Sequence, residues 1–290
     1  MDDQGYKVSS EIFTEKNYAI SKKPTVDNQN VVSKFNFILP EQTLRSSEDL
    51  MVSTVTVDAD GDLNVPRKKS RTSTAQYIEI EHKSSTILDL VGLQVWRGAL
   101  LLADWMIYNY KNIPEGSIIL ELGSGVGFTS IITSMFFPVI CTDIDKGNIL
   151  KVIESNVKRN KHLVRHPVKV LELDFISNEI PRDIMEHLPN IPVIIAADTI
   201  YDDSITDAFI KTICRFLQNS SDNTSIFVAL EKRYVFTISD CDTTAPCFDY
   251  FLESLKKLTD VKYEEVPLTF PKYFEYDRVK ELVLWKVTSS

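Results

Sequence analysis

Three glycines alternate in the segment LELGSGVGF, at Gly123, Gly125 and Gly127. The segment continues a short apolar run, 118–120, which is typical of a buried strand. A glycine turn at the end of such a strand lets a nucleotide-like cofactor approach the backbone. A dinucleotide-binding turn has the pattern GxGxxG and needs its third glycine at position 128, where this chain has Phe128. The pattern therefore departs from that of a pyrophosphate-binding turn.

Two carboxylates flank this turn, Glu121 and Asp143. Glu121 lies two residues before the first glycine, where it would face the ligand, and a negative group there suits a cofactor with a cationic end. S-adenosylmethionine is such a cofactor, because it has an amino group, a sulfonium and no phosphate. Asp143 ends the next predicted strand, where an acid can accept both hydroxyls of a ribose. Each residue alone has an ordinary structural explanation, but the set in this order favours a cofactor site.

Further candidates for the cofactor site lie in ELDF and at Trp96. Asp174 ends the third predicted strand, where its carboxylate could accept the exocyclic amine of adenine, and Phe175 could lie on the ring face. The alternative is a strand-end aspartate beside a core aromatic residue. Trp96 opens an apolar helical pattern, and it could line the pocket or pack in the core.

An alternation of strand and helix patterns positions these residues. Apolar runs predict strands at 118–122, 139–142, 168–173, 193–197 and 226–230, and apolar periodicity predicts helices at 128–137, 148–158 and 204–217. Ser204 and Asp207 form a predicted capping box for the last helix. A strand at 77–82 and a helix at 91–110 precede this series, and a helix at 248–258 and strands at 261–266 and 281–287 follow it. The alternation predicts a parallel sheet covered on both faces, with ligands at the carboxyl ends of its strands.

Composition changes near residue 75. Residues 1–75 are rich in Ser, Thr, Asp, Asn and Lys, which predicts a largely flexible N-terminal extension, and residues 76–290 carry the folded domain. The extension contains the basic cluster PRKKSR, residues 66–71. This cluster is either a nuclear-localisation patch or a solvated charge run.

Charge and composition limit the possible classes of function. The net charge of -9 argues against direct binding of nucleic acid and suits a basic partner, such as a lysine-rich protein segment. The chain has no apolar run of membrane-spanning length and no signal-peptide pattern, so we expect a soluble, non-secreted protein. We expect it to be a monomer in the nucleus, the cytoplasm or both. The four cysteines show no CxxC pairing, and His162 and His166 lack a third ligand, so no metal site is expected.

Several motifs together resemble a known family. ELGSGVG followed by CTDID resembles a seven-β-strand methyltransferase, and VWRGALLLADW, ELDF, AADTIYDD, ALEKR and VKELVLWKV resemble the methyltransferase-like lysine methyltransferases. The resemblance covers about residues 75 to 287 and implies an α/β, Rossmann-like fold. The implied sheet has seven strands, mostly parallel with the last antiparallel, and helices on both faces. Family members often carry Trp at the position of Phe175.

The resemblance also implies the cofactor and the residues that bind it. The methyl donor is S-adenosylmethionine. The implied binding residues are Trp96, Glu121, Gly123, Gly125, Gly127, Asp143, Asp174, Phe175 and Ala197.

The segment AADTIYDD follows the fourth predicted strand, beside the place where the methyl group would be presented. Many relatives that methylate planar amides or nucleobase amines carry an Asn or Asp followed by two prolines, and this chain lacks the prolines. Asp198 and Tyr201 suit a flexible cationic amine instead, because a carboxylate orients it by charge and a tyrosine offers a π face or a hydroxyl. The alternative is helix capping by Asp198, Asp202 or Asp203. The resemblance assigns the DxxY pattern to lysine methylation.

These observations predict an S-adenosylmethionine-dependent protein-lysine N-methyltransferase, with Asp198 and Tyr201 as the catalytic pair. Its partner would be a protein with an accessible lysine, such as a chaperone or a nucleic-acid-associated protein. The main task of the enzyme is positioning, and the lysine must lose its proton before it attacks the methyl carbon. Two alternatives are a non-catalytic protein-binding module and a methyltransferase that acts on a non-protein substrate.

Overall fold

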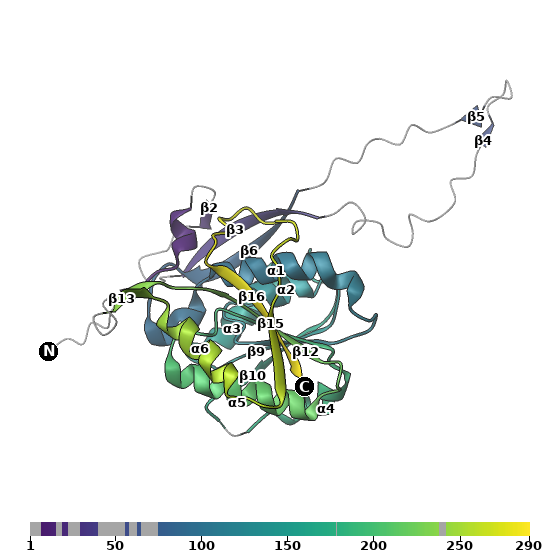
Figure 1. Ribbon diagram of the computed structural model, residues 1–290. Helices are drawn as coiled ribbons and strands as arrows, with labels where there is room; N and C mark the ends of the chain where they lie inside the picture. The colour runs from purple at the N-terminus through teal and green to yellow at the C-terminus, as the bar shows by residue number, and fades with distance from the viewer. Residues whose placement is uncertain are drawn as a thin grey trace.

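The computed structural model describes residues 7–15, 19–22, 30–39, 56–57, 63–64, 75–177, 179–237 and 242–290. Its centre is a seven-stranded sheet with helices on both faces (Figure 1). In spatial order the strands are β10 (Val168–Glu172), β9 (Val139–Asp143), β8 (Ile119–Leu122), β11 (Val193–Ala197), β12 (Ser225–Glu231), β16 (Leu282–Ser289) and β15 (Val261–Glu265). β16 is antiparallel to both of its neighbours, and the other neighbouring pairs are parallel. The predicted seven-stranded, mostly parallel α/β fold is confirmed.

The inner strands are apolar on both sides because helices cover both faces of the sheet. In β8, Ile119 packs into one core, and Leu120 and Leu122 pack into the other. The helices on the first face are α1 (Arg97–Asn109), α2 (Phe128–Thr133) and α3 (Ile149–Arg159). The helices on the second face are α4 (Arg182–His187), α5 (Asp203–Asn219) and α6 (Pro246–Lys256). Among the described residues, short 3-10 helices accompany them: η1 (Glu11–Thr14), η4 (Leu88–Leu93), η5 (Tyr110–Asn112) and η6 (Leu188–Asn190).

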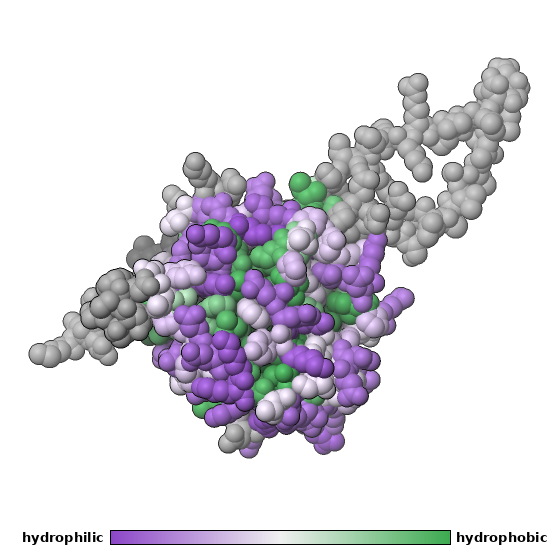
Figure 2. Space-filling model, viewed as in Figure 1, coloured by the Kyte–Doolittle hydropathy of each residue, from purple (hydrophilic) through white to green (hydrophobic). Residues whose placement is uncertain are grey.

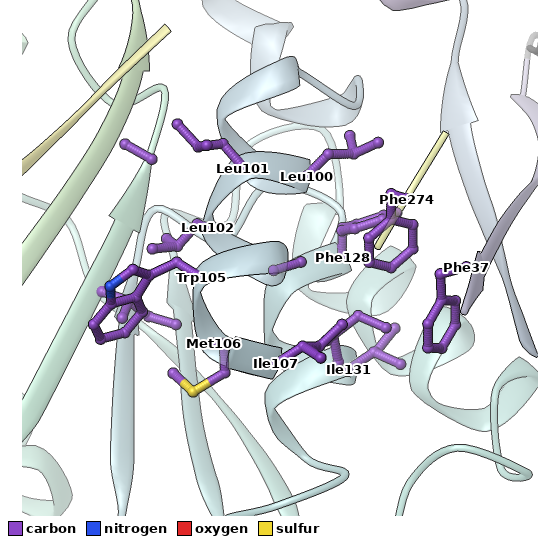
Figure 3. Close-up of a cluster of buried hydrophobic side chains, with 14 of the residues drawn as sticks. Phe37, Leu100, Leu101, Leu102, Trp105, Met106, Ile107, Phe128, Ile131 and Phe274 are labelled. Carbon is purple, nitrogen blue, oxygen red and sulfur yellow. The ribbon is translucent and has the colours of Figure 1, made fainter. Parts of the chain in front are cut away.

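Helix α1 packs against the sheet on one side and against aromatic residues on the other (Figure 3). Trp105 lies on the sheet side, where its ring centroid is 4.0 Å from that of Phe227. On the opposite side, Phe274 stacks on Phe37 at 4.7 Å and lies 5.2 Å from Phe128. These contacts fix the helix whose first turn borders the functional site.

The helix predicted over 91–110 is shorter than its apolar pattern suggested, because α1 begins at Arg97. The preceding residues form η4, which has a kink at Leu90. Gln94 is extended, with φ of -111°. Its side chain donates to the hydroxyl of Thr86 (2.7 Å) and to the carbonyl of Val8 (3.0 Å), which holds the segment away from a helical path.

The N-terminal part of the chain forms a second sheet, β2 (Ala19–Lys22), β3 (Asn30–Ile38) and β6 (Ala75–Lys83). The strand predicted at 77–82 is thus confirmed, and it pairs with β3 antiparallel from Asn30 with Lys83 to Ile38 with Ala75. Phe35 and Phe37 are buried in the core that contains α1. Apolar side chains from the described part of residues 1–75 thus belong to the main core, and the expectation of a largely flexible extension stays a prediction for the segment as a whole.

Two asparagines of α3 attach this second sheet to the main domain. Asn156 accepts from the backbone N–H of Glu81 (2.7 Å) and donates to its carbonyl (3.0 Å). Asn160 makes the same pair of bonds with Glu79, at 2.8 and 2.7 Å. The side-chain amides thus satisfy the free edge of β6 as another strand would. Asn156 also donates to the carbonyl of Val126, in the glycine turn.

The part of the chain that the structure describes also contains short strand pairs: β1 (Lys7–Val8) with β7 (Thr86–Ile87), β4 (Thr56–Val57) with β5 (Leu63–Asn64), and β13 (Val235–Thr237) with β14 (Asp242–Thr244). The basic cluster 66–71 lies outside the described residues. The predicted capping box of α5 is wrong, because Asp202 is the N-cap and its carboxylate accepts from Ile205 N (3.1 Å).

On the face of the described part that Figure 2 shows, hydrophilic side chains surround small hydrophobic areas. No helix within the described ranges is long and apolar enough to cross a membrane.

Candidate functional site

A pocket of about 330 Å³ lies at the carboxyl ends of β8, β9 and β11, where a sheet of this topology binds ligands. The strand order reverses there, because β9 and β11 lie on opposite sides of β8. The predicted site residues that line the pocket are Trp96, Glu121, Gly123, Gly125, Asp143, Asp174, Phe175, Ala197, Asp198 and Tyr201. Residues of β8, β9 and β11, and of the segments that follow β8, β10 and β11 or precede α1, thus meet at one place.

Gly127 is the predicted site residue that does not line the pocket. It is the N-cap of α2, with φ of 82°, and a Cβ there would lie 3.0 Å from Ile153. Its role is to start the helix and to let α3 pack closely. Gly125, in contrast, belongs to the pocket: its φ is 57°, and a Cβ would lie 2.9 Å from the carbonyl oxygen of Gly92. Glycine is required here because the turn touches the backbone of η4.

Glu121 and Asp143 form the polar base of the pocket. The Glu121 side chain accepts a short hydrogen bond from the hydroxyl of Ser130, and the residue is 1% exposed. The carboxylate of Asp143 accepts from Gly125 N (2.7 Å) and Ile144 N (2.8 Å), so it fixes the glycine turn. Burial raises the pKa of both carboxyl groups to about 7. A cationic ligand would favour their ionised forms.

The charge of the lining suits a cationic ligand without phosphate. Six acidic residues line the pocket: Asp89, Glu121, Asp143, Asp174, Asp198 and Asp202. Among the described lining residues the basic side chain is Lys146, which pairs with Asp89 at 2.7 Å. A pyrophosphate would meet repulsion here, whereas the amino group and sulfonium of S-adenosylmethionine would meet attraction. The residues present therefore fit this cofactor.

Asp174 and Phe175 follow β10 and line the other end of the pocket. Asp174 Oδ1 accepts from Ile176 N (2.9 Å), which orients the carboxylate. The ring of Phe175 packs edge-on against Phe209, with centroids 5.5 Å apart. The ring is thus held by the second core and is half-buried beside Gly123.

Trp96 lines the pocket rather than the core. Its indole N–H donates to the carbonyl of Val91 (3.0 Å), so the ring is attached to η4. The guanidinium of Arg233 lies over the ring, 4.6 Å from the centroid. η4 itself supplies a wall of the pocket from Leu88 to Leu93, which the sequence reasoning missed. The break between η4 and α1 could have been predicted from Gly92 and the polar Gln94, which interrupt the apolar run.

Asp198 connects three segments of the site. Its Oδ2 atom accepts from Gly98 N in the first turn of α1 (2.7 Å), and its Oδ1 atom accepts from Glu231 N (3.2 Å). Its φ of 51° is a left-handed conformation that aspartate tolerates better than most residues. Burial raises the pKa of this carboxyl group, and nearby Arg233 opposes that effect. The capping alternative thus holds for Asp202, which caps α5. Asp198 instead accepts from the first turn of α1 and also lines the pocket.

Tyr201 is half-buried in the pocket wall. Burial, together with the charges of Asp143, Asp202 and Asp89, raises the pKa of its phenol to about 12. The phenol therefore remains protonated at neutral pH, which suits a hydrogen-bond donor or a π face and excludes a base with a pKa near 7.

His162 and His166 do not form a metal site. His162 bonds through its ring nitrogen Nε2 to the carbonyl of Tyr77 (3.0 Å) and packs on the tyrosine ring. Within the described ranges, no group of three or more His, Cys, Asp or Glu side chains could hold a metal ion.

Residues 74–244, more than half of the chain, match the model of a family described as lysine methyltransferase. The chain is 35% identical to mouse (Mus musculus) methyltransferase-like protein 22 over 72% of this chain and 58% of that protein. It is 34% identical to the human (Homo sapiens) protein of the same name, over 76% and 59% of the two chains. The chain thus spans less than two thirds of the length of these relatives.

Among solved structures, the glycopeptide N-methyltransferase MtfA in complex with S-adenosylmethionine is 10% identical. The likeness covers 67% of this chain and 94% of that chain, with a TM-score of 0.46. Since the family model covers the glycine turn, Asp143 and the Asp198–Tyr201 segment, the chain belongs to the lysine methyltransferase family.

Proposed function

We propose that this protein is an S-adenosylmethionine-dependent protein-lysine N-methyltransferase. The observation that carries the proposal is that Glu121, Asp143, Asp198 and Tyr201 line one pocket. We assign the first two to the cofactor end and the last two to the acceptor end. A protein-binding module needs neither cofactor-binding nor acceptor-binding residues, whereas a methyltransferase needs both. Family membership supports the same conclusion.

The methyl donor, when bound, supplies an electrophilic methyl group on a positively charged sulfonium. Glu121 and Asp143 would bind its cationic and ribose groups, and Asp174 and Phe175 would contact its adenine. Trp96 and the η4 wall would exclude water from the region between cofactor and acceptor.

Asp198 would orient the acceptor amine. Both of its oxygens already accept one backbone N–H, but each retains a lone pair for a further donor. The hydroxyl of Tyr201 remains protonated and would help to place the amine beside the methyl group. A lysine near a bound sulfonium loses its proton more readily, because a neighbouring positive charge lowers the pKa of an amine. Positioning and this electrostatic effect are sufficient, so no dedicated general base is assigned.

Transfer of a radiolabelled methyl group from S-adenosylmethionine into lysate proteins tests the proposal. We expect label in protein, released as methyl-lysine after acid hydrolysis and resistant to nuclease. Label that nuclease removes would favour a nucleic-acid substrate. Cofactor binding without any incorporation would contradict the enzyme and favour the protein-binding module.

A further inference from the structure

A segment that precedes the family match contacts residues on both sides of Trp96, which lines the pocket. Residues 7–15, which we call the N-terminal strap, lie outside the matched range 74–244. β1, in the strap, pairs with β7, and the strap then crosses to the start of α1. Gln94 holds it there, because its side chain accepts from Ser10 N (2.9 Å) and donates to the carbonyl of Val8 (3.0 Å).

The far end of the strap is anchored by a buried ion pair. Glu15 Oε1 accepts from Arg97 Nε (2.7 Å), and the two side chains are 6% and 10% exposed. Arg97 also donates to Glu231 Oε1 (2.9 Å), and the backbone N–H of Glu231 donates to Asp198. Breaking a buried pair of this kind is costly, so this end of the strap is a fixed anchor.

A second, more exposed ion pair joins the strap to Arg233, which lies over the pocket-lining Trp96. Arg233 Nη1 is 2.8 Å from Glu11 Oε1, and the two side chains are 36% and 47% exposed. The same guanidinium covers the ring of Trp96. The strap therefore contacts residues on both sides of Trp96, namely Gln94 and Arg97, and reaches the ring itself through Arg233.

The charges of this network do not balance. The guanidiniums of Arg97 and Arg233 face four carboxylates, those of Glu11, Glu15, Asp198 and Glu231. One oxygen of Glu231 is buried without a hydrogen-bond partner. Asp202, the N-cap of α5, adds another negative charge at the pocket. The acceptor end of the pocket is thus negative. Glu11 has the most exposed of these carboxylates, and its partner Arg233 lies over the pocket-lining Trp96.

We propose that the N-terminal strap completes an acidic acceptor mouth, in which Glu11 binds a basic side chain beside the target lysine and Arg233 positions Glu11. The inference rests on the proposed function and names the class of substrate: a protein segment with Lys or Arg next to the acceptor lysine. Because the Glu11–Arg233 pair is half exposed, a basic residue can share the Glu11 carboxylate without unfolding the strap. Glu11 is therefore a specificity-determining residue, and Arg233 is a positioning residue.

The test uses the full chain and labelled methyl transfer into lysate proteins. The variant is Glu11→Gln, which removes charge but keeps shape. The matched control is Glu186→Gln, which breaks another exposed ion pair, with Arg182 on α4, away from the pocket. We expect Glu11→Gln to lower the initial rate at low lysate concentration roughly fivefold, as for loss of one partly exposed pair, and Glu186→Gln to match the wild type. Affinity for S-adenosylhomocysteine, measured by calorimetry, should be unchanged in both.

A second readout separates recognition from a purely structural effect. Poly-arginine, which offers cations but no lysine, should inhibit wild-type labelling at low concentration and inhibit Glu11→Gln several-fold less. Equal rates and equal inhibition in wild type and Glu11→Gln would overturn the strap proposal alone. Absence of labelling by the wild type would overturn the proposed function and this proposal with it.

Discussion

The carboxylate of Asp198 accepts a 2.7 Å hydrogen bond from the backbone N–H of Gly98, one hundred residues earlier in the chain. The contact joins the end of β11 to the first turn of α1, directly beside Trp96. An N–H at the start of a helix carries partial positive charge, so it both orients the carboxylate and supports its ionised form. The residue assigned to the acceptor amine is thus oriented by the protein before any substrate binds.

Gly98→Ala should disturb this arrangement, because a Cβ at position 98 would overlap the carboxylate of Asp198. We expect methyl transfer to fall by about tenfold or more, as for displaced catalytic groups, while affinity for S-adenosylhomocysteine changes little. Paired measurements of transfer rate and of calorimetric Kd check this. A variant with normal transfer would show that the position of the carboxylate is not important.

Substitutions of Asp198 should separate its structural role from its chemical role. Asp198→Ala leaves two backbone N–H groups without a partner and places Ala in a left-handed conformation, so it should lower the free energy of unfolding by about 1–3 kcal/mol. Asp198→Asn keeps one of the two acceptor atoms and tolerates this conformation, so it should lower the free energy of unfolding less than Asp198→Ala does. Both should transfer methyl groups slowly. Full turnover by the Asn variant would contradict the role of charge in orienting the amine.

Asp143→Ala should weaken cofactor binding without unfolding the protein. The carboxylate fixes Gly125 N and Ile144 N and would accept the ribose hydroxyls, so its loss should cost about 1–3 kcal/mol of binding free energy. Calorimetric titration with S-adenosylhomocysteine measures this change, and thermal unfolding provides the control. An unchanged Kd would show that Asp143 does not contribute to cofactor binding.

Cofactor affinity should depend on pH in a defined direction. Glu121 and Asp143 have pKa values raised to about 7 by burial, and a cationic ligand favours their ionised forms. Affinity for S-adenosylmethionine should therefore rise between about pH 6 and pH 8, and more steeply than affinity for the uncharged thioether S-adenosylhomocysteine. In the free protein, the same raised pKa values mean that the contribution of these groups to stability is present at low pH and lost as the pH rises through about 7. Equal pH profiles for the two ligands would contradict this electrostatic account.

The sequence predicted those parts of the molecule that depend on local patterns. The glycine turn, Glu121 and Asp143 lie within one strand, helix and strand unit, where apolar runs and glycine spacing are readable. Placing Asp198 in the same pocket required the rule that ligands bind at the carboxyl ends of parallel strands. The side chains lie close together because the carboxyl ends of the parallel strands lie at the same edge of the sheet.

The parts that were missed depend on contacts between distant segments. The pairing of β3 with β6 joins Asn30 to Lys83, and the composition of residues 1–75 does not reveal it. The ion pair of Glu15 with Arg97 is equally distant, and neither residue lies in a recognisable motif. The break before α1 was hidden because the apolar residues of η4 continue the apolar pattern of the helix. In each case tertiary contacts, not local propensity, decide the structure.

Mass spectrometry of cellular lysine methylation, after removal of this protein and after its restoration, tests the central claim most directly. Restoration should use the wild type in one arm and Asp198→Asn in the other. We predict that methylation at one or a few lysines disappears on removal, returns with the wild type and does not return with Asp198→Asn. If no lysine changes its methylation on removal, or if Asp198→Asn restores methylation fully, the claim that this pocket transfers methyl groups to lysine is contradicted.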